Sequence, residues 1–434
     1  MSSAVTVVDE KEVRASPPQY AEPLPRVGKK LGAQQCPAEQ QAGIAGEVPE
    51  TQRRPHEDTC ERIPLLLDTG SDLVWVPCTS SYQCSNCSFP PAGVPLFSPK
   101  ASSSAKLLGC RNPKCAWLHA PKVLDRCRDC PLNASAAAGC SRVCPPYVVV
   151  YGSGLTAGLL LSETMDVSER PGGDVLDFVV GCSIFSTHQP PAGVAGFGRG
   201  PASLPSQLGL RRFSYCLISR IYDDQEGAMG DVVLEGAAES SRDGLSFTPF
   251  LRNPAATAGS PFSVYYYLGL RRITVDGAKV RIPHAALLPL PCGDGGTIID
   301  SGTTFTYMEP RVFEPVAWAV AAAAAGRYNR SEALEQLTGL RPCFRLAGGG
   351  NRLPQLTFHW KGGAKMRLPP ANYFALVGDE EAACLTLMTD AGDAGRRGPS
   401  IILGSFQQQN YYVVYDLEKE RLGLRQQSCF EDSG

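Results

Sequence analysis

Two aspartates in matching settings are the residues of this sequence best suited to do chemistry. Residues 68–71 read Asp-Thr-Gly-Ser after the apolar run 65–67, and residues 300–303 read Asp-Ser-Gly-Thr after the apolar run 297–299. Both patterns predict a strand, a tight glycine turn and a second strand. Two carboxylates in equivalent positions could share one proton and activate a water molecule, which is general acid–base chemistry.

A simpler interpretation is that each aspartate only accepts hydrogen bonds from the amides of its own turn, as aspartates in glycine-containing turns often do. One Asp-Thr-Gly segment would not exclude this. A carboxylate at the end of a buried strand is costly to desolvate, however, and two of them with the same flanking pattern favour a common use. We therefore expect Asp68 and Asp300 to form one site.

A second repeated pattern and a hairpin accompany the aspartates. Residues 194–198 and 401–405 each place a glycine after an apolar run, and glycine is needed where two backbones approach closely. Their order relative to Asp68 and Asp300 predicts two related halves. Residues 147–161 alternate β-branched and aromatic residues around a Gly-Ser-Gly tip, which predicts a hairpin.

The cysteines indicate an oxidising compartment. The sequence has 17 cysteines, ten of them from Cys78 to Cys182, and their crowding predicts loops held by disulfides. Zinc is the alternative, because two Cys-x-x-Cys pairs have the spacing of metal ligands; these pairs are Cys84 with Cys87 and Cys127 with Cys130. Glycosylation sequons begin at Asn86, Asn133 and Asn329. The odd number leaves at least one cysteine unpaired, and we expect this to be Cys36 or Cys60.

Composition limits the possible functions. The 434 residues are enough for two lobes, and 44 Gly with 36 Pro suit short strands and turns. A net charge of −2 gives no reason to expect nucleic acid or an acidic membrane as a partner. No apolar run is long enough to span a membrane. None of the five histidines lies in a recognisable catalytic triad or zinc-protease motif.

The chain resembles the pepsin-like aspartic proteases, and in detail their plant nepenthesin-like branch. The resemblance is carried by the two aspartate segments, the cysteine-rich insert after Val76, and the segments 193–200, 213–217 and 402–410. It implies a mostly β, bilobal fold with a cleft between two related lobes. The domains expected are a disordered or atypical tail (1–60), an N-terminal catalytic lobe (61–212) with the cysteine-rich insert (78–146) and a flap hairpin (147–161), and a C-terminal catalytic lobe (213–434).

The same resemblance implies an aspartic endopeptidase that hydrolyses peptide bonds at acidic pH through Asp68 and Asp300. Residues expected to support the two carboxylates are Thr69, Gly70, Ser71, Ser301, Gly302 and Thr303. Tyr151 and Gly152 would form the flap, with Trp75 as its partner, although core packing would explain Trp75 equally well. The resemblance also implies disulfides between Cys216 and Cys429 and between Cys343 and Cys384.

Partners and location follow from the resemblance as well. We expect protein or peptide substrates, a monomer, and no cofactor, metal or nucleic acid. An extracellular, cell-wall or vacuolar location is expected, although charges at residues 9–12 leave no visible signal peptide. One alternative is a catalytically silent binding or inhibitor protein on the same fold. Another is an inactive product of an altered N-terminus, because residues 44–62 are charged where the family has an apolar strand.

Overall fold

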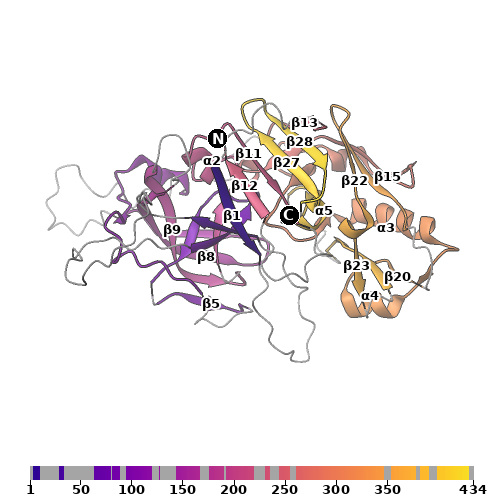
Figure 1. The fold of residues 1–434 in the computed structure, drawn as a ribbon, viewed down its shortest axis with the longest axis horizontal. Coiled ribbons are helices and arrows are strands. Elements are labelled where there is room, and N and C mark those ends of the chain that lie inside the picture. Colours follow the sequence, from indigo (N-terminus) through magenta and orange to yellow (C-terminus); the bar gives the residue numbers. More distant parts are fainter. Residues whose placement is uncertain are drawn as a thin grey trace, which may run out of the picture. The chain divides into compact units, whose positions relative to one another are not determined.

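Short strands and turns make up most of the computed structural model, which forms two compact units (Figure 1). The residues described are 3–9, 29–33, 63–79, 81–87, 94–119, 127, 143–166, 175–189, 192–218, 230–234, 244–254, 261–346, 353–377, 382–390 and 398–429. The first unit comprises Met1–Val5, Leu31–Leu66 and Leu73–Ala195; the second comprises Thr6–Lys30, Leu67–Asp72 and Gly196–Gly434. The predicted mostly β class is confirmed.

The first 60 residues contain two strands, β1 (Ser3–Asp9) and β2 (Lys29–Ala33). The other residues of this range lie outside the described part of the chain, and so does the range 44–62 in which the sequence lacks an apolar strand. The tail and the missing strand therefore stay predictions.

The first unit is built on one sheet with the strand order β3-β10-β4-β9-β8-β6. These strands are β3 (Ile63–Asp68), β10 (Gly193–Gly196), β4 (Trp75–Pro77), β9 (Val175–Thr187), β8 (Leu155–Met165) and β6 (Lys106–Leu107). Two further strands, β5 (Gln83–Ser85) on β9 and β7 (Tyr147–Val150) on β8, complete it, and a 3-10 helix, η2, covers Pro113–Trp117. Its core includes Trp75, Tyr147 and Val194.

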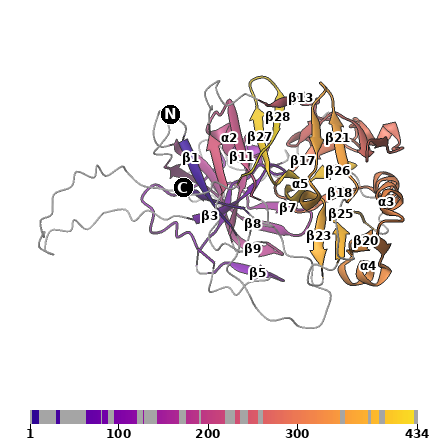
Figure 2. The ribbon, with the colours of Figure 1, turned by 45° about the vertical axis from the view of Figure 1, so that its right-hand side comes forward.

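The expected hairpin is formed by β7 and β8, which lie next to β9 and β5 in Figure 2. Pairing runs from Tyr147 opposite Gly158 to Val150 opposite Leu155. The turn closes where the Tyr151 amide donates to the Gly154 carbonyl at 2.7 Å. Glycine at the tip lets the chain reverse within four residues, as the sequence pattern predicted.

The second unit contains several sheets. Five neighbouring strands of a 15-stranded sheet pair in the order β13 (Ser246–Pro249), β28 (Arg421–Gln426), β27 (Tyr411–Asp416), β11 (Arg212–Cys216) and β12 (Gly230–Leu234). A second sheet has the order β14 (Tyr266–Leu268), β17 (Thr297–Ile299), β26 (Ile401–Leu403), β18 (Thr306–Met308) and β25 (Leu387–Met388). The residue pattern at 411–416 and 421–424 predicts two closing strands, and these are β27 and β28.

Two four-stranded sheets complete the second unit. Their strands are β16 (Ala278–Lys279), β15 (Leu270–Val275), β21 (Leu356–Trp360) and β22 (Lys365–Arg367) in one, and β19 (Asn329–Arg330), β20 (Cys343–Arg345), β24 (Ala382–Leu385) and β23 (Phe374–Val377) in the other. The aromatic and β-branched residues at 265–270 and 273–275 predict a pair of strands, and this pairing is wrong. Only Gly269 separates β14 from β15, which is too short for a hairpin turn, and β14 pairs with β17 while β15 pairs with β21.

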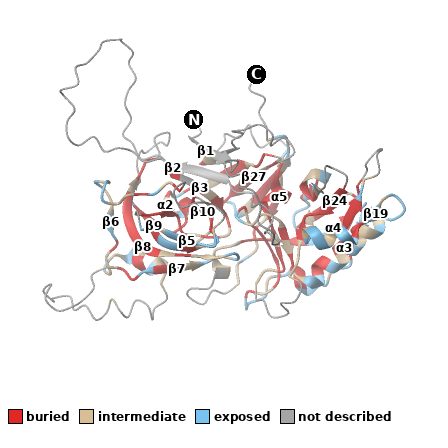
Figure 3. Cartoon of the chain, turned by 90° about the horizontal axis from the view of Figure 1, so that it is seen from below, coloured by how far each residue is buried: buried red, intermediate tan, exposed pale blue. Residues whose placement is uncertain are grey.

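The α-helices of the described residues are α2 (Leu204–Gln207), α3 (Pro310–Ala324), α4 (Glu332–Thr338) and α5 (Ser405–Gln408), with 3-10 helices η5 (Pro261–Ser263), η6 (His284–Leu287) and η7 (Pro370–Asn372). The sequence predicts helices at residues 203–208, 312–326 and 331–337, close to α2, α3 and α4. Val312, Val316 and Val320 bury one side of α3 at helical spacing. Figure 3 shows exposed residues on the other side of α3 and on α4. No helix among the described residues is long and apolar enough to cross a membrane.

The strand arrangement repeats. In the first unit β10 is antiparallel to β4, and β4 is parallel to β9. In the second unit β26 is antiparallel to β18, and β18 is parallel to β25. The first strand of each set, β3 or β17, leads into one of the two aspartate turns. The sequence repeat therefore corresponds to a repeated four-strand unit.

Disulfides join most cysteines of the described part of the chain. They are Cys78–Cys182, Cys84–Cys87, Cys110–Cys127, Cys115–Cys144, Cys216–Cys429 and Cys343–Cys384. Both pairs implied by the family resemblance are present. Cys292 is free and exposed, which was not predicted. The expected free cysteines, Cys36 and Cys60, lie outside the described residues.

Candidate active site

Asp68 and Asp300 both lie in the second unit, each where a strand gives way to its turn. Asp68 ends β3, and its carbonyl accepts from the Phe197 amide at 2.7 Å. Asp300 follows β17, and its amide donates to the Leu403 carbonyl at 3.0 Å. The main chain of each aspartate is thus bonded to the glycine-containing segment of its own half.

Each carboxylate is held by its own turn in the same order. The Gly70 amide donates to Asp68 Oδ1 at 2.9 Å, and the Ser71 hydroxyl donates to Asp68 Oδ2. The Gly302 amide donates to Asp300 Oδ1 at 2.8 Å, and the Thr303 hydroxyl donates to Asp300 Oδ2 at 2.6 Å. The turn bonds of the simpler interpretation are therefore present. They leave open a further use, because each carboxylate oxygen has more than one acceptor site.

The two turns are also bonded to each other. The Thr69 amide donates to Ser301 Oγ at 3.1 Å, and the Ser301 amide donates to Thr69 Oγ1 at 2.9 Å. Each hydroxyl then donates back across the pair, Ser301 to the Leu67 carbonyl at 2.8 Å and Thr69 to the Ile299 carbonyl at 3.5 Å. Thr69 is fully buried and Ser301 is nearly so. This reciprocal arrangement fixes the two turns face to face.

The glycines allow the carboxylates to approach. A Cβ added to Gly70 would lie 2.6 Å from Asp300 Cγ, and one added to Gly302 would collide with Asp68 Oδ1. Asp68 is 6% exposed, and Asp300 is less buried. Burial and the neighbouring Asp300 charge raise the pKa of Asp68, because both disfavour a second negative charge there. The pair is therefore arranged to share a proton.

The second glycine pair also makes close contacts. Gly196 packs on the backbone of Asp72, four residues after Asp68, and a Cβ on Gly404 would lie 2.6 Å from the carbonyl oxygen of Thr304, four residues after Asp300. The need for glycine at both positions is as predicted. Asp72 accepts a 2.9 Å hydrogen bond from the Gly200 amide, and burial raises the pKa of Asp72 to about 7.

The expected flap residues lie in the first unit. The indole Nε1 of Trp75 donates to the Tyr151 hydroxyl at 2.8 Å. Trp75 is fully buried, whereas Tyr151 is half-buried and Gly152 is exposed in the turn between β7 and β8. Trp75 therefore fits both expected roles, core packing and partner of the flap, because its ring fills the core while its single polar atom binds Tyr151.

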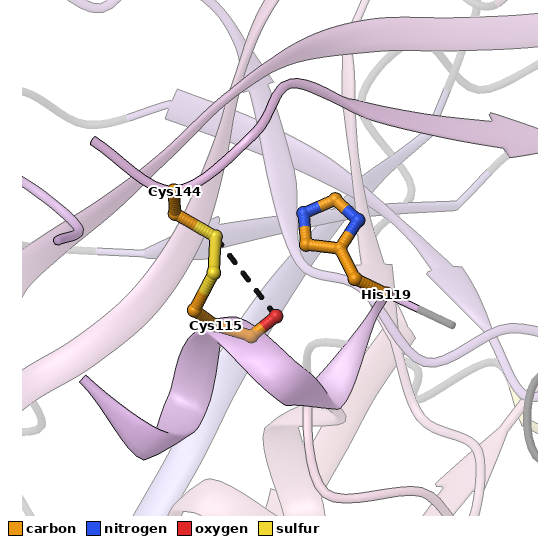
Figure 4. A group of neighbouring side chains, drawn as sticks. All are labelled: Cys115, His119 and Cys144. Carbon is orange, nitrogen blue, oxygen red and sulfur yellow. Dashed lines mark hydrogen bonds between the residues drawn. A yellow bond between two sulfur atoms is a disulfide. The ribbon is translucent and has the colours of Figure 1, made fainter. Parts of the chain in front are cut away.

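A cluster of possible metal ligands, Cys115, His119 and Cys144, also lies in the first unit (Figure 4). Its two sulfur atoms form a disulfide, so neither can act as a thiolate ligand. The cysteines of the zinc alternative are likewise used: Cys84 pairs with Cys87, and Cys127 pairs with Cys110, while Cys130 lies outside the described residues. Their sulfur atoms support the disulfide interpretation.

Four further residues that surround the aspartate pair were not predicted from the sequence. Asp72 directly follows the first turn and could have been noticed as a third carboxylate. Gln408 lies within a segment used for the family resemblance, and its Nε2 donates to the Asp300 carbonyl at 3.2 Å. Tyr215 and Tyr415 lie on β11 and β27, where alternation predicts only that a side chain is buried.

Comparisons with known proteins identify the family. Residues 57–234 match a family model described as xylanase inhibitor N-terminal, and residues 265–426 match one described as xylanase inhibitor C-terminal. A probable aspartyl protease of Arabidopsis thaliana is 33% identical over 412 residues, covering 85% of this chain and 79% of that protein. Aspartic proteinase nepenthesin-2 of Nepenthes gracilis is 30% identical over 370 residues, covering 84% of this chain and 74% of that protein.

A solved structure has the same fold. The crystal structure of basic 7S globulin from soybean superposes with a TM-score of 0.62 and 19% identity, covering 99% of this chain and 96% of that one. The predicted mostly β, bilobal fold of the pepsin type is confirmed. With two aspartate turns of matching sequence and geometry, and with relatives of this identity and coverage, the chain belongs to the plant family of pepsin-like aspartic proteases, which includes the nepenthesins.

Proposed function

We propose that this protein is an aspartic endopeptidase that hydrolyses peptide bonds of protein substrates at acidic pH. The observation that carries the proposal is the reciprocal bonding of Thr69 and Ser301, which fixes Asp68 and Asp300 against each other. Two carboxylates this close cannot both ionise easily, so the pair holds one proton over an acidic range of pH. That state contains both an acid and a base, which peptide hydrolysis needs.

The geometry favours Asp68 as the acid and Asp300 as the base. Asp68 is the more buried carboxyl, and burial favours its neutral form. In the first step Asp300 takes a proton from a water molecule as the water oxygen attacks the peptide carbonyl carbon, and Asp68 gives its proton to the carbonyl oxygen. In the second step the C–N bond breaks, the proton on Asp300 passes to the leaving amine, and a hydroxyl proton of the intermediate returns to Asp68.

Supporting roles follow from the hydrogen bonds. Ser71 and Thr303 each donate to one carboxylate oxygen of their own turn, which fixes the orientation of the carboxyl planes. Gly70 and Gly302 leave room for the opposing carboxylates. Tyr151, bonded to Trp75, is proposed to close over bound substrate and exclude water. An exposed Gly152 beside it would let the tip of the hairpin move.

The first test measures hydrolysis of acid-denatured globin at about pH 3 to 5, with and without pepstatin, by the wild type and by Asp68→Asn and Asp300→Asn. Each asparagine keeps the side-chain volume but removes the shared proton. We expect each variant to lose activity by about 1000-fold or more and to keep its thermal unfolding midpoint.

Asp276→Asn is the matched control, because Asp276 lies on a turn of the second unit where it binds Arg327. It should hydrolyse globin like the wild type. Unchanged activity in Asp68→Asn or Asp300→Asn would contradict the mechanism.

A binding protein on the same fold is the second candidate. It is favoured by the two matching family models, whose descriptions name xylanase inhibitors. A folded protein that does not cleave globin but inhibits a xylanase would establish this function instead. A protein that does neither and unfolds without a cooperative transition would favour the inactive product of an altered N-terminus.

The protein is further proposed to be a secreted or vacuolar monomer. The six disulfides among the described residues indicate that it matures in an oxidising compartment. Asn86 and Asn329, the sequon asparagines among the described residues, are both exposed and could carry glycans. Loss of mass on treatment with a glycosidase, measured on protein from its natural source, would test entry into the secretory pathway.

A further inference from the structure

Behind the aspartate pair lie three buried residues from separate elements of the second unit. Tyr215 belongs to β11, Tyr415 to β27 and Gln408 to α5. Tyr415 and Gln408 are fully buried, and Tyr215 is 1% exposed. Three polar side chains in such a position need hydrogen-bond partners, and those they find belong to the site itself.

Their hydrogen bonds run from one aspartate turn to the other. The Tyr415 hydroxyl lies 3.5 Å from Thr69 Oγ1, and the hydroxyls of Tyr415 and Tyr215 are 3.0 Å apart. Tyr215 donates to Gln408 Oε1 at 2.6 Å. The Nε2 group of Gln408 then donates to the Asp300 carbonyl at 3.2 Å and to the Leu403 carbonyl at 2.9 Å.

The orientation of Gln408 sets the direction of these bonds. Its two amide protons are used on the two carbonyls, so its oxygen must accept, and the proton of Tyr215 is used there. Tyr415 must therefore donate in the bond between the two phenols. Its hydroxyl proton is shared between Tyr215 and Thr69. Burial raises the pKa of both phenols, so they stay neutral donors throughout the acidic range.

The rings are fixed independently of their hydroxyls. Tyr415 stacks on Phe213 with ring centroids 4.3 Å apart, and it meets Tyr266 edge-on at 4.8 Å. Tyr215 and Tyr415 also pack together, with centroids 5.8 Å apart. Phenylalanine could therefore replace either tyrosine and keep this packing, which makes the hydroxyl alone testable.

The hydroxyls of Thr69 and Ser301 differ in the length of their hydrogen bonds to main-chain carbonyls. Ser301 donates to the Leu67 carbonyl at 2.8 Å, whereas the bond from Thr69 to the Ile299 carbonyl is 3.5 Å long. The Thr69 hydroxyl thus has a long bond to its main-chain acceptor, and Tyr415 adds a second contact of the same length beside the 2.9 Å bond from the Ser301 amide. Through Tyr215 and Gln408, Tyr415 is connected to Asp300.

We propose that Tyr415, Tyr215 and Gln408 are positioning residues of the proteolytic site, which fix the Thr69 hydroxyl and the Asp300 main chain relative to each other. The proposal rests on the proposed endopeptidase function. It predicts that removing any one hydrogen bond in the chain loosens the alignment of the carboxylates. Small misalignments of reacting groups reduce turnover more than they reduce substrate binding.

The test compares Tyr415→Phe, Tyr215→Phe, their double variant and Gln408→Leu with the wild type in globin or peptide hydrolysis. Each single variant should lower kcat by about tenfold, keep KM within about twofold, and shift the acidic limb of the pH–rate profile. Because the phenols act in one chain, the double variant should lose little more than the worse single variant.

Tyr411→Phe is the matched control. Tyr411 is a buried tyrosine of the same strand, and its hydroxyl donates to the Arg367 carbonyl at 2.6 Å instead of to the site. It should lose thermal stability to a similar extent as Tyr415→Phe but keep the wild-type kcat and pH–rate profile.

The outcomes separate the two proposals. An active wild type in which Tyr415→Phe behaves like Tyr411→Phe overturns the positioning role alone, and so does a double variant whose losses multiply. A folded wild type that hydrolyses nothing overturns the endopeptidase function, and the positioning role falls with it. A thermal unfolding midpoint measured for every variant identifies any loss that is due to misfolding.

Discussion

The turn at residues 68–72 and the turn at residues 300–304 make the same hydrogen bonds, yet they differ in their surroundings. In both, a glycine amide and a hydroxyl hold the carboxylate, and a Thr or Ser reaches across to the other turn. Asp68 is the more buried carboxyl, and only the Thr69 side is backed by Tyr415. The equivalent bonds fix the geometry, while the unequal surroundings distinguish the two carboxyls.

The fifth residue of each turn differs most. Asp72 is a third carboxylate, enclosed by Gly196, Gly198 and Gly200. A Cβ added to any of these glycines would collide with Asp72. Thr304 in the other half has no charge, and there Gly404 is followed by α5. The first turn is therefore tied to a glycine-rich loop through an ionisable group, and the second turn is tied to a helix.

Among the variants that compare the two turns, the largest loss of activity is expected at Gly70 and Gly302, where the turns are most alike. Gly70→Ala and Gly302→Ala each place a methyl group against the opposing carboxylate, so both should reduce kcat/KM by about 100-fold or more. Gly209→Ala is the control: its φ of 61° strains an alanine, but nothing lies within 4 Å of its added Cβ. It should cost stability without affecting hydrolysis. A Gly70→Ala variant with near wild-type turnover would show that the carboxylates are farther apart than described.

Removing the hydroxyl of Thr69 or Ser301 should have an intermediate effect, and the loss of stability should differ between the two turns. Ser301→Ala leaves the Thr69 amide and the Leu67 carbonyl without their partner. Thr69→Val leaves the Ser301 amide without its partner and otherwise removes two 3.5 Å contacts, one to the Ile299 carbonyl and one from Tyr415, which keeps Tyr215 as an acceptor. Each lost buried partner costs about 1–3 kcal/mol. Urea unfolding should therefore find Ser301→Ala the less stable variant, with Thr69→Ser and Ser301→Thr close to the wild type. Equal losses would mean that the two hydroxyls are equivalent.

Replacing Asp72 should have the smallest effect on hydrolysis and the clearest effect on how stability depends on pH. The pKa of Asp72 is raised to about 7, so the folded protein binds its proton more tightly than the unfolded chain does. Its contribution to stability is therefore present at low pH and is lost as pH rises from about 4 to about 7. Asp72→Asn keeps an oxygen for the Gly200 amide and removes the titration.

The free energy of unfolding of Asp72→Asn should exceed that of the wild type at pH 8 by on the order of 2 to 4 kcal/mol and match it at pH 4. Thermal or urea unfolding at the two pH values measures the difference. The pKa of Asp68 is also raised, so Asp68 likewise lowers stability as pH rises, and it is still present in the Asp72→Asn variant. The free energy of unfolding of this variant should therefore still fall with pH, but less steeply than that of the wild type. If the free energy of unfolding of Asp72→Asn fell with pH as steeply as that of the wild type, Asp72 would not be the group responsible.

Several elements of the site could be predicted because their physical reasons are local. A strand that ends in Asp-Thr-Gly or Asp-Ser-Gly positions its carboxylate over the following amide, and both turns do so. The hairpin at 147–161 follows from its own residue pattern and turn. The disulfides Cys216–Cys429 and Cys343–Cys384 followed instead from the family resemblance. The pairing of 265–270 with 273–275 failed because hydrophobic pattern identifies strands and not their partners.

The sequence by itself determined the chemistry that could be expected here: two aspartates in repeated turns, a glycine beside each, and cysteines suited to an oxidising compartment. Tertiary structure decided which groups surround them. Tyr215 meets Tyr415 because β11 pairs with β27, and Gln408 reaches Asp300 from α5. Contacts between residues far apart in the chain depend on strand pairing and packing in three dimensions, and a local pattern of polar and apolar residues carries no record of them.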